Sequence, residues 1–347
     1  MGTVRRRLQL AAVAVVATLT AGVLTACSSG TSANTVTLSL VAYSTPQAAY
    51  AKIIKAFQAT SAGKNVKFTQ SYGASGDQSR AVAAGQKADI VAFSLSPDID
   101  RLAKANLVAA DWNSNQYKGM VTNSVVVIAT RKGNPKSIKT WDDLIKPGVS
   151  VISPNPISSG GARWNTIAAY GAESNKGADA AAGMAYLNKL FPQIAVQDTS
   201  ARASLQTFIS GKGDAMIAYE NDAIFAQQNG QPLDYTVPDS TILIENPVAV
   251  TSNSPHPAQA KAFLDFLYTP TAQKNYAQNG YRPIVPGTDI GKQSFPTPSN
   301  LFTIDDVGGW TKVTTDFFDA KTGSVTAIEQ RLGVPTTTTT PKASATP

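Results

Sequence analysis

The sequence has very little of the side chains on which most enzymes and metal sites depend. Of its 347 residues, one is a cysteine, Cys27, and one is a histidine, His256. A single thiol excludes an internal disulfide. A catalytic Ser-His pair or a His-rich zinc site would have to be built on His256 alone, which lies in the loop sequence Ser-Pro-His-Pro. No Walker loop, dinucleotide-binding glycine fingerprint or HExxH motif is present. We therefore expect no enzyme, cofactor or metal site.

Excess charge is also scarce. The chain has 30 Lys and Arg against 23 Asp and Glu, and three of the Arg fall in the first 26 residues, which contain no acid. The rest carries 27 − 23 = +4, scattered along the chain. We see no basic stripe with interleaved aromatic residues, so nucleic acid is not an expected partner.

The N-terminus has the layout of a signal peptide over residues 1–26. Arg5 to Arg7 form a charged start, and an apolar run without charge extends from Leu8 to Ala26. Small residues then precede Cys27, as in a bacterial lipobox, which predicts a lipidated Cys27 followed by a flexible tether over 27–34. An ordinary signal peptide with an incidental cysteine is the alternative, and the triple Arg leaves general and twin-arginine export open.

Strand and helix patterns alternate through the rest of the chain, which favours an α/β fold. About 320 residues remain after the leader, enough for two lobes. Expected strands cover 36–42, 66–71, 88–95, 123–130, 149–153, 194–198, 215–219, 241–244 and 248–250. Expected helices follow Thr45-Pro46, begin near 75 and 161, and cover 179–190, 204–209 and 257–268. The Thr/Pro-rich tail, 333–347, is expected to be disordered.

Three segments share one design, in which a strand ends, small residues follow and a helix begins. They cover residues 71–78, 158–164 and 198–204. A helix start exposes unpaired backbone N–H groups at the positive end of the helix dipole. Glycine and serine let an anion approach that backbone closely. A serine before a helix is also the usual N-cap, so one segment alone indicates little, but three together predict an anion cage without direct Lys or Arg contacts.

An ordered series of short motifs is more specific. It comprises Ser75-Gly76 with Gln78, Pro97-Asp98-Ile99-Asp100, Arg131-Lys132-Gly133-Asn134-Pro135-Lys136, Trp141-Asp142-Asp143-Leu144, Pro154-Asn155-Pro156, Ser159-Gly160-Gly161-Ala162-Arg163-Trp164-Asn165, Ala201-Arg202, Glu220-Asn221 and Tyr281-Arg282-Pro283. With this series, the chain resembles the sulfate/thiosulfate-binding proteins of bacterial ABC importers, within the type II periplasmic binding protein fold. The resemblance extends from Thr37 to Pro283.

The resemblance implies a set of ligand-binding residues, because the family holds dehydrated sulfate with hydrogen-bond donors from both lobes. By position, the donors are the backbone N–H groups of Ser75, Gly160, Gly161 and Ala201, the Ser159 hydroxyl and the side chain of Tyr219. Tyr219 is a departure, since the family has a tryptophan there. A phenol can donate a hydrogen bond but can also accept one, which bears on anion selectivity. The alternative is an aromatic side chain that only packs at a strand end.

Three further residues are candidates for ligand contact or for support of the site. Ser44 stands where the family usually has an aspartate of the supporting network. Arg163 and Arg202 resemble residues that orient the binding loops through carboxylates, and exposed surface positions are the alternative.

The matched positions also predict selectivity. Sulfate needs donors only, whereas monohydrogen phosphate carries a proton that needs an acceptor. None of the matched positions is a carboxylate, so sulfate is favoured as long as Asp77, Asp198 and Glu220 point away from the anion.

These observations predict a two-lobed α/β type II periplasmic binding protein with two crossover strands. Lobe 1 is expected over 35–122 and 245–332, and lobe 2 over 123–244. The expected function is capture of sulfate, or thiosulfate, and its delivery to the permease of an ABC importer with a cytoplasmic ATPase. We expect a monomer, anchored by Cys27 to the outer face of the cell membrane. Molybdate, tungstate or phosphate binding, an extracytoplasmic hydrolase or transferase, and an adhesin or sensor remain alternatives.

Overall fold

The structure, a computed structural model, describes residues 35–337. The predicted signal peptide (1–26), the lipidation site Cys27, the tether (27–34) and residues 338–347 of the predicted tail lie outside the described residues. Within 35–337, no helix combines the length and the apolar character needed to cross a membrane.

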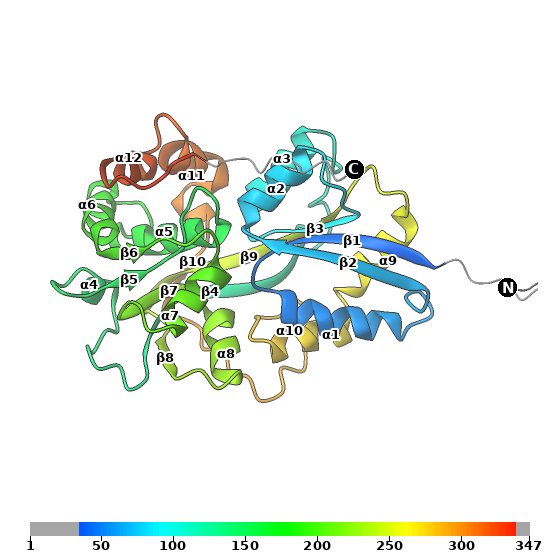
Figure 1. The fold of residues 1–347 in the computed structure, drawn as a ribbon, viewed down its shortest axis with the longest axis horizontal. Helices are drawn as coiled ribbons and strands as arrows, with labels where there is room; N and C mark the ends of the chain where they lie inside the picture. Colours follow the sequence, from blue (N-terminus) through cyan, green and yellow to red (C-terminus); the bar gives the residue numbers. More distant parts are fainter. Residues whose placement is uncertain (1–34, 338–347) are drawn as a thin grey trace, which may run out of the picture. The chain divides into compact units, whose positions relative to one another are not determined.

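The first lobe is a sheet with helices on both faces (Figure 1). Its elements are β1 (Val36–Tyr43), α1 (Gln47–Gln58), β2 (Val66–Gly73), α2 (Ser75–Ala83), β3 (Ile90–Ala92), α3 (Ser96–Lys104), α9 (Pro257–Phe266) and α10 (Pro270–Gln278). The strands are parallel, with β1 between β2 and β3. Alternate side chains of β1 serve the two faces: Leu40 packs in the same core cluster as α1, whereas Val41 packs with Val82 of α2 and Ile99 of α3.

The second lobe repeats this layered arrangement. Its elements are α4 (Trp141–Leu144), β5 (Val151–Ile152), α5 (Gly160–Glu173), α6 (Ala180–Leu190), the 3-10 turn Phe191–Gln193, β6 (Ile194–Val196), α7 (Ala201–Ile209), β7 (Ala215–Tyr219), α8 (Glu220–Gln228) and β8 (Leu233–Thr236). Strand β5 lies between β6 and β7 and is parallel to both.

Two long strands, β4 (Met120–Arg131) and β9 (Ser240–Val250), connect the lobes. The first half of β4 pairs antiparallel with the middle of β9; β9 then continues beside β3, and β4 continues beside β7 and β8. The described strands form one sheet in the order β2-β1-β3-β9-β4-β7-β5-β6. This is the mixed α/β, two-lobed periplasmic binding protein fold expected from the sequence, and each crossover strand belongs to both lobes.

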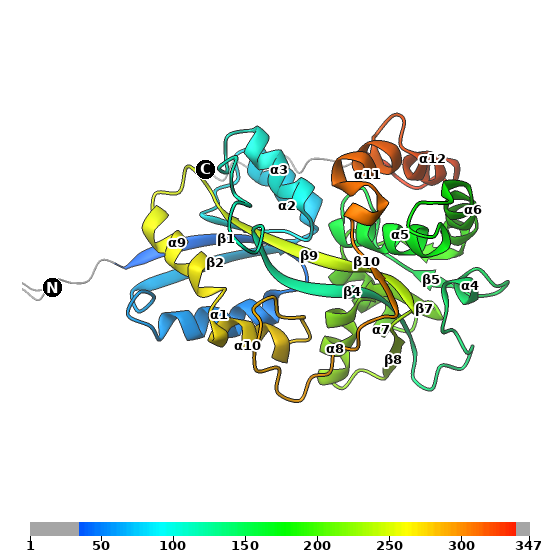
Figure 2. The same ribbon diagram turned by 180° about the vertical axis from the view of Figure 1, so that it is seen from behind.

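The end of the chain packs differently from the prediction. Residues 300–332 were expected in lobe 1, but β10 (Asn300–Phe302), the 3-10 turn Asp305–Val307, α11 (Gly309–Phe318) and α12 (Ser324–Arg331) lie beside α5 and α6 (Figure 2). Trp310 contacts Trp164 edge-on with ring centroids 4.6 Å apart, and Phe317 contacts Tyr170 at 4.7 Å. The assignment fails because the apolar pattern of a helix shows that it needs a partner, not which lobe supplies it.

Several element boundaries also differ. The apolar run 88–95 forms a strand only over Ile90–Ala92, and the strands expected at 241–244 and 248–250 are one continuous strand, β9. Helix α7 begins at Ala201 rather than near 204, and Pro46, not Thr45, is the N-cap of α1. The first residues of the expected disordered tail are ordered, because Val334 N donates to Glu329 O and Asn155 Nδ2 donates to Pro335 O.

Candidate functional site

A small cavity lies where the two lobes meet. It is lined by Tyr43, Ser44, Thr45, Ser75, Ser94, Ser159, Gly161, Ala201 and Tyr219. Six of the candidate residues from the sequence are therefore brought together: Ser44, Ser75, Ser159, Gly161, Ala201 and Tyr219. Gly160, Arg163 and Arg202 are not in the lining, although each follows a lining residue closely in the sequence.

Four helices begin at this cavity. Helix α2 starts at Ser75, α5 at Gly160, α7 at Ala201 and α8 directly after Tyr219. The hydroxyl of Ser159 caps α5 by accepting from Ala162 N (3.3 Å), and Ser200 caps α7 in the same way. Each helix start presents backbone N–H groups and the positive end of its dipole, so the cavity suits a negatively charged group.

The backbone N–H of Ser75, rather than its hydroxyl, is the group available to a ligand. Its Oγ donates to Asp98 Oδ2 (2.6 Å) and accepts from Ser94 N (3.0 Å). Asp98 is buried and also pairs with Arg101 (2.8 Å). This network fixes the start of α2, and the Asp98 carboxylate is engaged in it and is not part of the cavity lining.

The lobes are closed over the cavity, because hydrogen bonds cross from one to the other. Trp164 Nε1 donates to Ser94 O (2.7 Å) and Gly76 N donates to Ser158 O (3.0 Å). On the side of α7, Arg202 N donates to Ser44 Oγ (3.3 Å).

Two glycines allow this close approach. A Cβ at Gly160 would overlap Ser94 Oγ and lie 2.6 Å from Leu95 Cδ2, while a Cβ at Gly76 would lie 2.8 Å from Ser158 O. Neither glycine has a positive φ, so its role is steric and not conformational. Gly160 is therefore a contact point between the lobes.

The two arginine candidates support loops in different ways. Arg202 donates to Thr45 O (2.8 Å) and lies 3.8 Å from the buried Asp222. Burial raises the pKa of Asp222 to about 6, and Arg202 opposes that rise. Arg163 does not pair with a carboxylate as the resemblance implied: Nε donates to Pro156 O (2.9 Å), and the guanidinium lies over the Phe318 ring.

The three carboxylates that could repel an anion, Asp77, Asp198 and Glu220, bind other partners and do not line the cavity. Asp77 pairs with Arg80, Asp198 accepts from Ser204 and Thr207, and Glu220 forms a two-pronged bond with Arg282 at 2.7 and 3.0 Å. None of the residues that line the cavity is acidic. Within the described residues, no group of His, Cys, Asp and Glu could hold a metal ion.

Sequence reasoning missed three lining residues, Tyr43, Thr45 and Ser94. Tyr43 ends β1, and Ser94 comes two residues after the end of β3. The carboxyl ends of parallel strands are the usual location of binding sites in open α/β sheets, and this signal could have found both residues.

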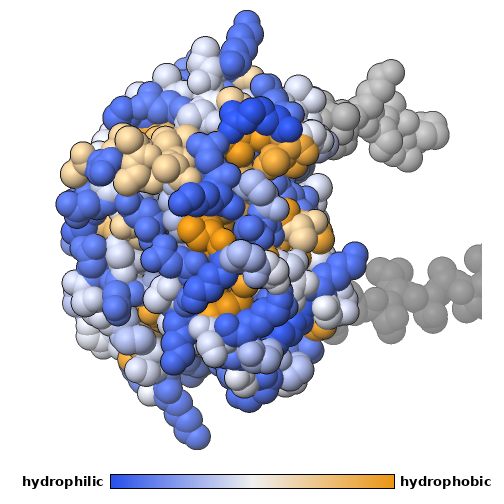
Figure 3. Space-filling view, turned by 90° about the vertical axis from the view of Figure 1, so that its left-hand side faces the viewer, coloured by the Kyte–Doolittle hydropathy of each residue, from blue (hydrophilic) through white to orange (hydrophobic). Residues whose placement is uncertain are grey.

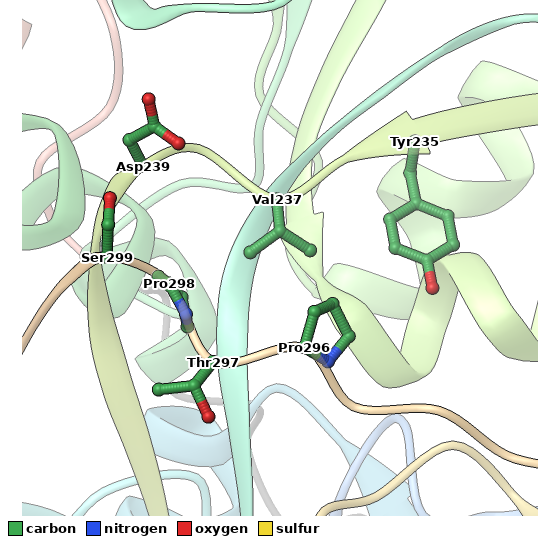
Figure 4. A pocket seen from close by; sticks show the side chains of 7 residues that line it. All are labelled: Tyr235, Val237, Asp239, Pro296, Thr297, Pro298 and Ser299. Carbon is green, nitrogen blue, oxygen red and sulfur yellow. The ribbon is translucent and has the colours of Figure 1, made fainter.

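A second pocket is a poor alternative. It lies between the β8–β9 connection and residues 296–299, and Figure 4 shows Val237 and Pro296 at its centre, with Asp239 and Tyr235 at opposite ends. Asp239 is the only charged residue in its lining, and no helix begins among the residues that line it. It therefore lacks the features that favour an anion.

Comparison with known proteins agrees with this geometry. Residues 38–282 match the family described as "Bacterial extracellular solute-binding protein". The sulfate-binding protein of Synechococcus elongatus is 41% identical over 321 residues, which cover 88% of this chain and 92% of that protein. The sulfate-binding protein of Salmonella typhimurium is 39% identical, covering 84% and 92%. The solved structure of the sulfate-binding protein SubI from Mycobacterium tuberculosis superimposes with a TM-score of 0.79 and 44% identity, covering 82% of this chain and 100% of that one.

Proposed function

The chain belongs to the family of bacterial extracellular solute-binding proteins, and we propose that it captures sulfate between its lobes and delivers it to an ABC importer. Like its relatives, which are sulfate-binding proteins, it is a binding protein and not an enzyme. One observation carries the proposal: donors from both lobes converge on a cavity whose lining has no carboxylate and no lysine or arginine. The N–H groups of Ser75, Gly161 and Ala201 and the Ser159 hydroxyl would surround the dianion.

Selectivity for sulfate follows from the same lining. Monohydrogen phosphate brings a proton, and a site without a carboxylate satisfies that proton poorly. A buried mismatch of this kind costs about 1–3 kcal/mol, or roughly 5- to 150-fold in affinity. Molybdate and tungstate have longer bonds and need a larger cage, so their affinities relative to sulfate measure the size of this one.

Titration calorimetry of the purified protein, stripped of bound anions, tests the proposal with sulfate, thiosulfate, molybdate and phosphate. We expect sulfate to bind with a 1:1 stoichiometry and phosphate to bind more weakly. Tighter binding of phosphate or molybdate than of sulfate would refute the assignment.

Tyr219→Phe tests the phenol. Loss of one hydrogen bond to a charged ligand costs about 1.5–3 kcal/mol, so we expect sulfate affinity to fall roughly 10- to 150-fold. Tyr235→Phe is the matched control, because Tyr235 lies in the other pocket. Unchanged affinity in Tyr219→Phe would remove Tyr219 from the site.

We also propose that the protein is exported, lipidated at Cys27 and held as a monomer on the outer face of the membrane. The lipobox layout before Cys27 supports the anchor. Hydrophilic residues predominate on the face in Figure 3, and Leu332 is the only large apolar side chain exposed among the described residues, which supports a monomer. Cys27→Ser should release the protein from the membrane fraction, and sedimentation should give a single chain's mass.

A further inference from the structure

Two buried hydroxyls in the cavity form no hydrogen bond of ordinary length within the described residues. They are Ser94 Oγ, from the first lobe, and Tyr219 OH, from the second. Each residue is 1% exposed. Buried polar groups in folded proteins are nearly always paired, so a pair of unsatisfied hydroxyls facing one cavity points to a ligand that satisfies both.

Every other polar group of Ser94 is engaged. Its N–H donates to Ser75 Oγ (3.0 Å), and its carbonyl oxygen accepts from Trp164 Nε1 (2.7 Å) and Asn246 Nδ2 (3.1 Å). These partners belong to the first lobe, the second lobe and the crossover strand β9. Ser94 is therefore held in place from three sides, and its hydroxyl is the one group left to face the cavity.

The hydroxyl of Ser94 also lies against the first turn of α5. A Cβ built on Gly160 would overlap Ser94 Oγ, which places this oxygen against the first residue of α5. The phenol of Tyr219 lines the same cavity. Burial raises the pKa of Tyr219, and the side chains of Ser94 and Asn246 oppose that rise from nearby.

We infer that Ser94 is a further ligand-contacting, specificity-determining residue of the cage, and that its hydroxyl and the Tyr219 phenol bind the same side of the anion. The inference rests on the proposed function. Sulfate has no proton to give, so both hydroxyls donate to it. Each hydroxyl proton can rotate about its C–O bond, and each hydroxyl restricts the orientation of the other O–H bond, so the two donors act together on the anion.

The test measures anion affinity in Ser94→Ala, Tyr219→Phe and the double variant by titration calorimetry with sulfate, selenate and phosphate. We expect Ser94→Ala to weaken sulfate binding about 10-fold, which is typical for a lost hydrogen bond to a charged group. The double variant should lose clearly less than the product of the two single losses, because the two hydroxyls act on one side of the ligand. Ser96→Ala is the matched control, since Ser96 is half-buried and outside the cavity lining.

Each outcome has a distinct meaning. Unchanged affinity in Ser94→Ala, with wild-type protein that binds sulfate, overturns the role of Ser94 and leaves the proposed function standing. A loss in Ser94→Ala that multiplies with that of Tyr219→Phe, together with a lower unfolding temperature without anion, shows that Ser94 only packs and also overturns the inference. Wild-type protein that binds none of the anions overturns both proposals.

Discussion

Gly160→Ala would place a methyl group where the two lobes meet. Gly160 is the first residue of α5, and the groups that the methyl would overlap, Ser94 Oγ and the Leu95 side chain, belong to the other lobe. In an open conformation the methyl would meet neither of them. The backbone is already helical there, so alanine stabilises the free protein slightly, by about 0.4–1 kcal/mol, through the unfolded chain. The variant should thus be stable but unable to close fully.

The distances set the size of the effect. Leu95 Cδ2 would lie 2.6 Å from the new methyl, whereas an ordinary contact is about 3.5–4 Å. Because Ser94 and Leu95 are both fully buried and have little room to rotate away, we expect the lobes to separate by roughly 1 Å. A separation of that size stretches the Trp164–Ser94 hydrogen bond, now 2.7 Å, beyond bonding range. Donors of one lobe move away from an anion held by the other. Loss of one such bond costs about 1.5–3 kcal/mol, so sulfate affinity should fall roughly 10- to 150-fold.

Two measurements check this prediction together. Calorimetric titration with sulfate gives the affinity, and thermal unfolding without sulfate gives the stability of the free protein. We expect a weaker affinity and an equal or higher unfolding temperature. Wild-type affinity would refute the steric role of Gly160, and a lower unfolding temperature would show that the methyl disturbs α5 itself.

Two other predictions concern buried charges. Burial holds the pKa of Asp222 near 6, above the ordinary value of 3.8, so protonated Asp222 adds to the free energy of unfolding fully below about pH 4, and this contribution is lost as the pH rises through 6. The loss amounts to at most about 3 kcal/mol. Asp222→Asn should flatten this decline when the free energy of unfolding is measured in urea at pH 4–7. Arg282→Ala should destabilise the protein by about 3–5 kcal/mol, because it leaves the fully buried Glu220 without its partner. Lys261→Ala, at an exposed ion pair, should change stability by less than about 0.5 kcal/mol, and equal effects in both variants would contradict the reasoning.

The sequence was informative where function depends on local backbone. Ser75, Ser159 and Ala201 each follow a strand and precede a helix, and a helix start exposes N–H groups wherever it lies in the fold. The structure brings all three to one cavity. The role of each in ligand binding stays a prediction, since it depends on the anion itself.

What the sequence did not show depends on contacts between distant segments. The hydroxyl of Ser94 became notable because Trp164 and Asn246 fix its backbone, and these residues lie 70 and 152 positions away. Gly160 was expected as a donor to the ligand, but its closeness to Ser94 and Leu95 appears only when the lobes meet. Amphipathic patterns in 300–332 show buried faces without naming their partners.

The return of the C-terminal helices to the second lobe affects the order in which the protein can fold. The family match ends at residue 282, yet Phe302, Val313, Phe317 and Ile328 belong to the same buried cluster as Trp164 and Tyr170. A ribosome or export channel releases the chain N-terminus first, so one flank of α5 stays bare until nearly the whole protein has emerged. The second lobe can therefore start to fold early, but its core is complete only after α11 and α12 have emerged. Until then, the rings of Trp164 and Tyr170 lack their partners Trp310 and Phe317, and a chaperone could bind this exposed apolar surface.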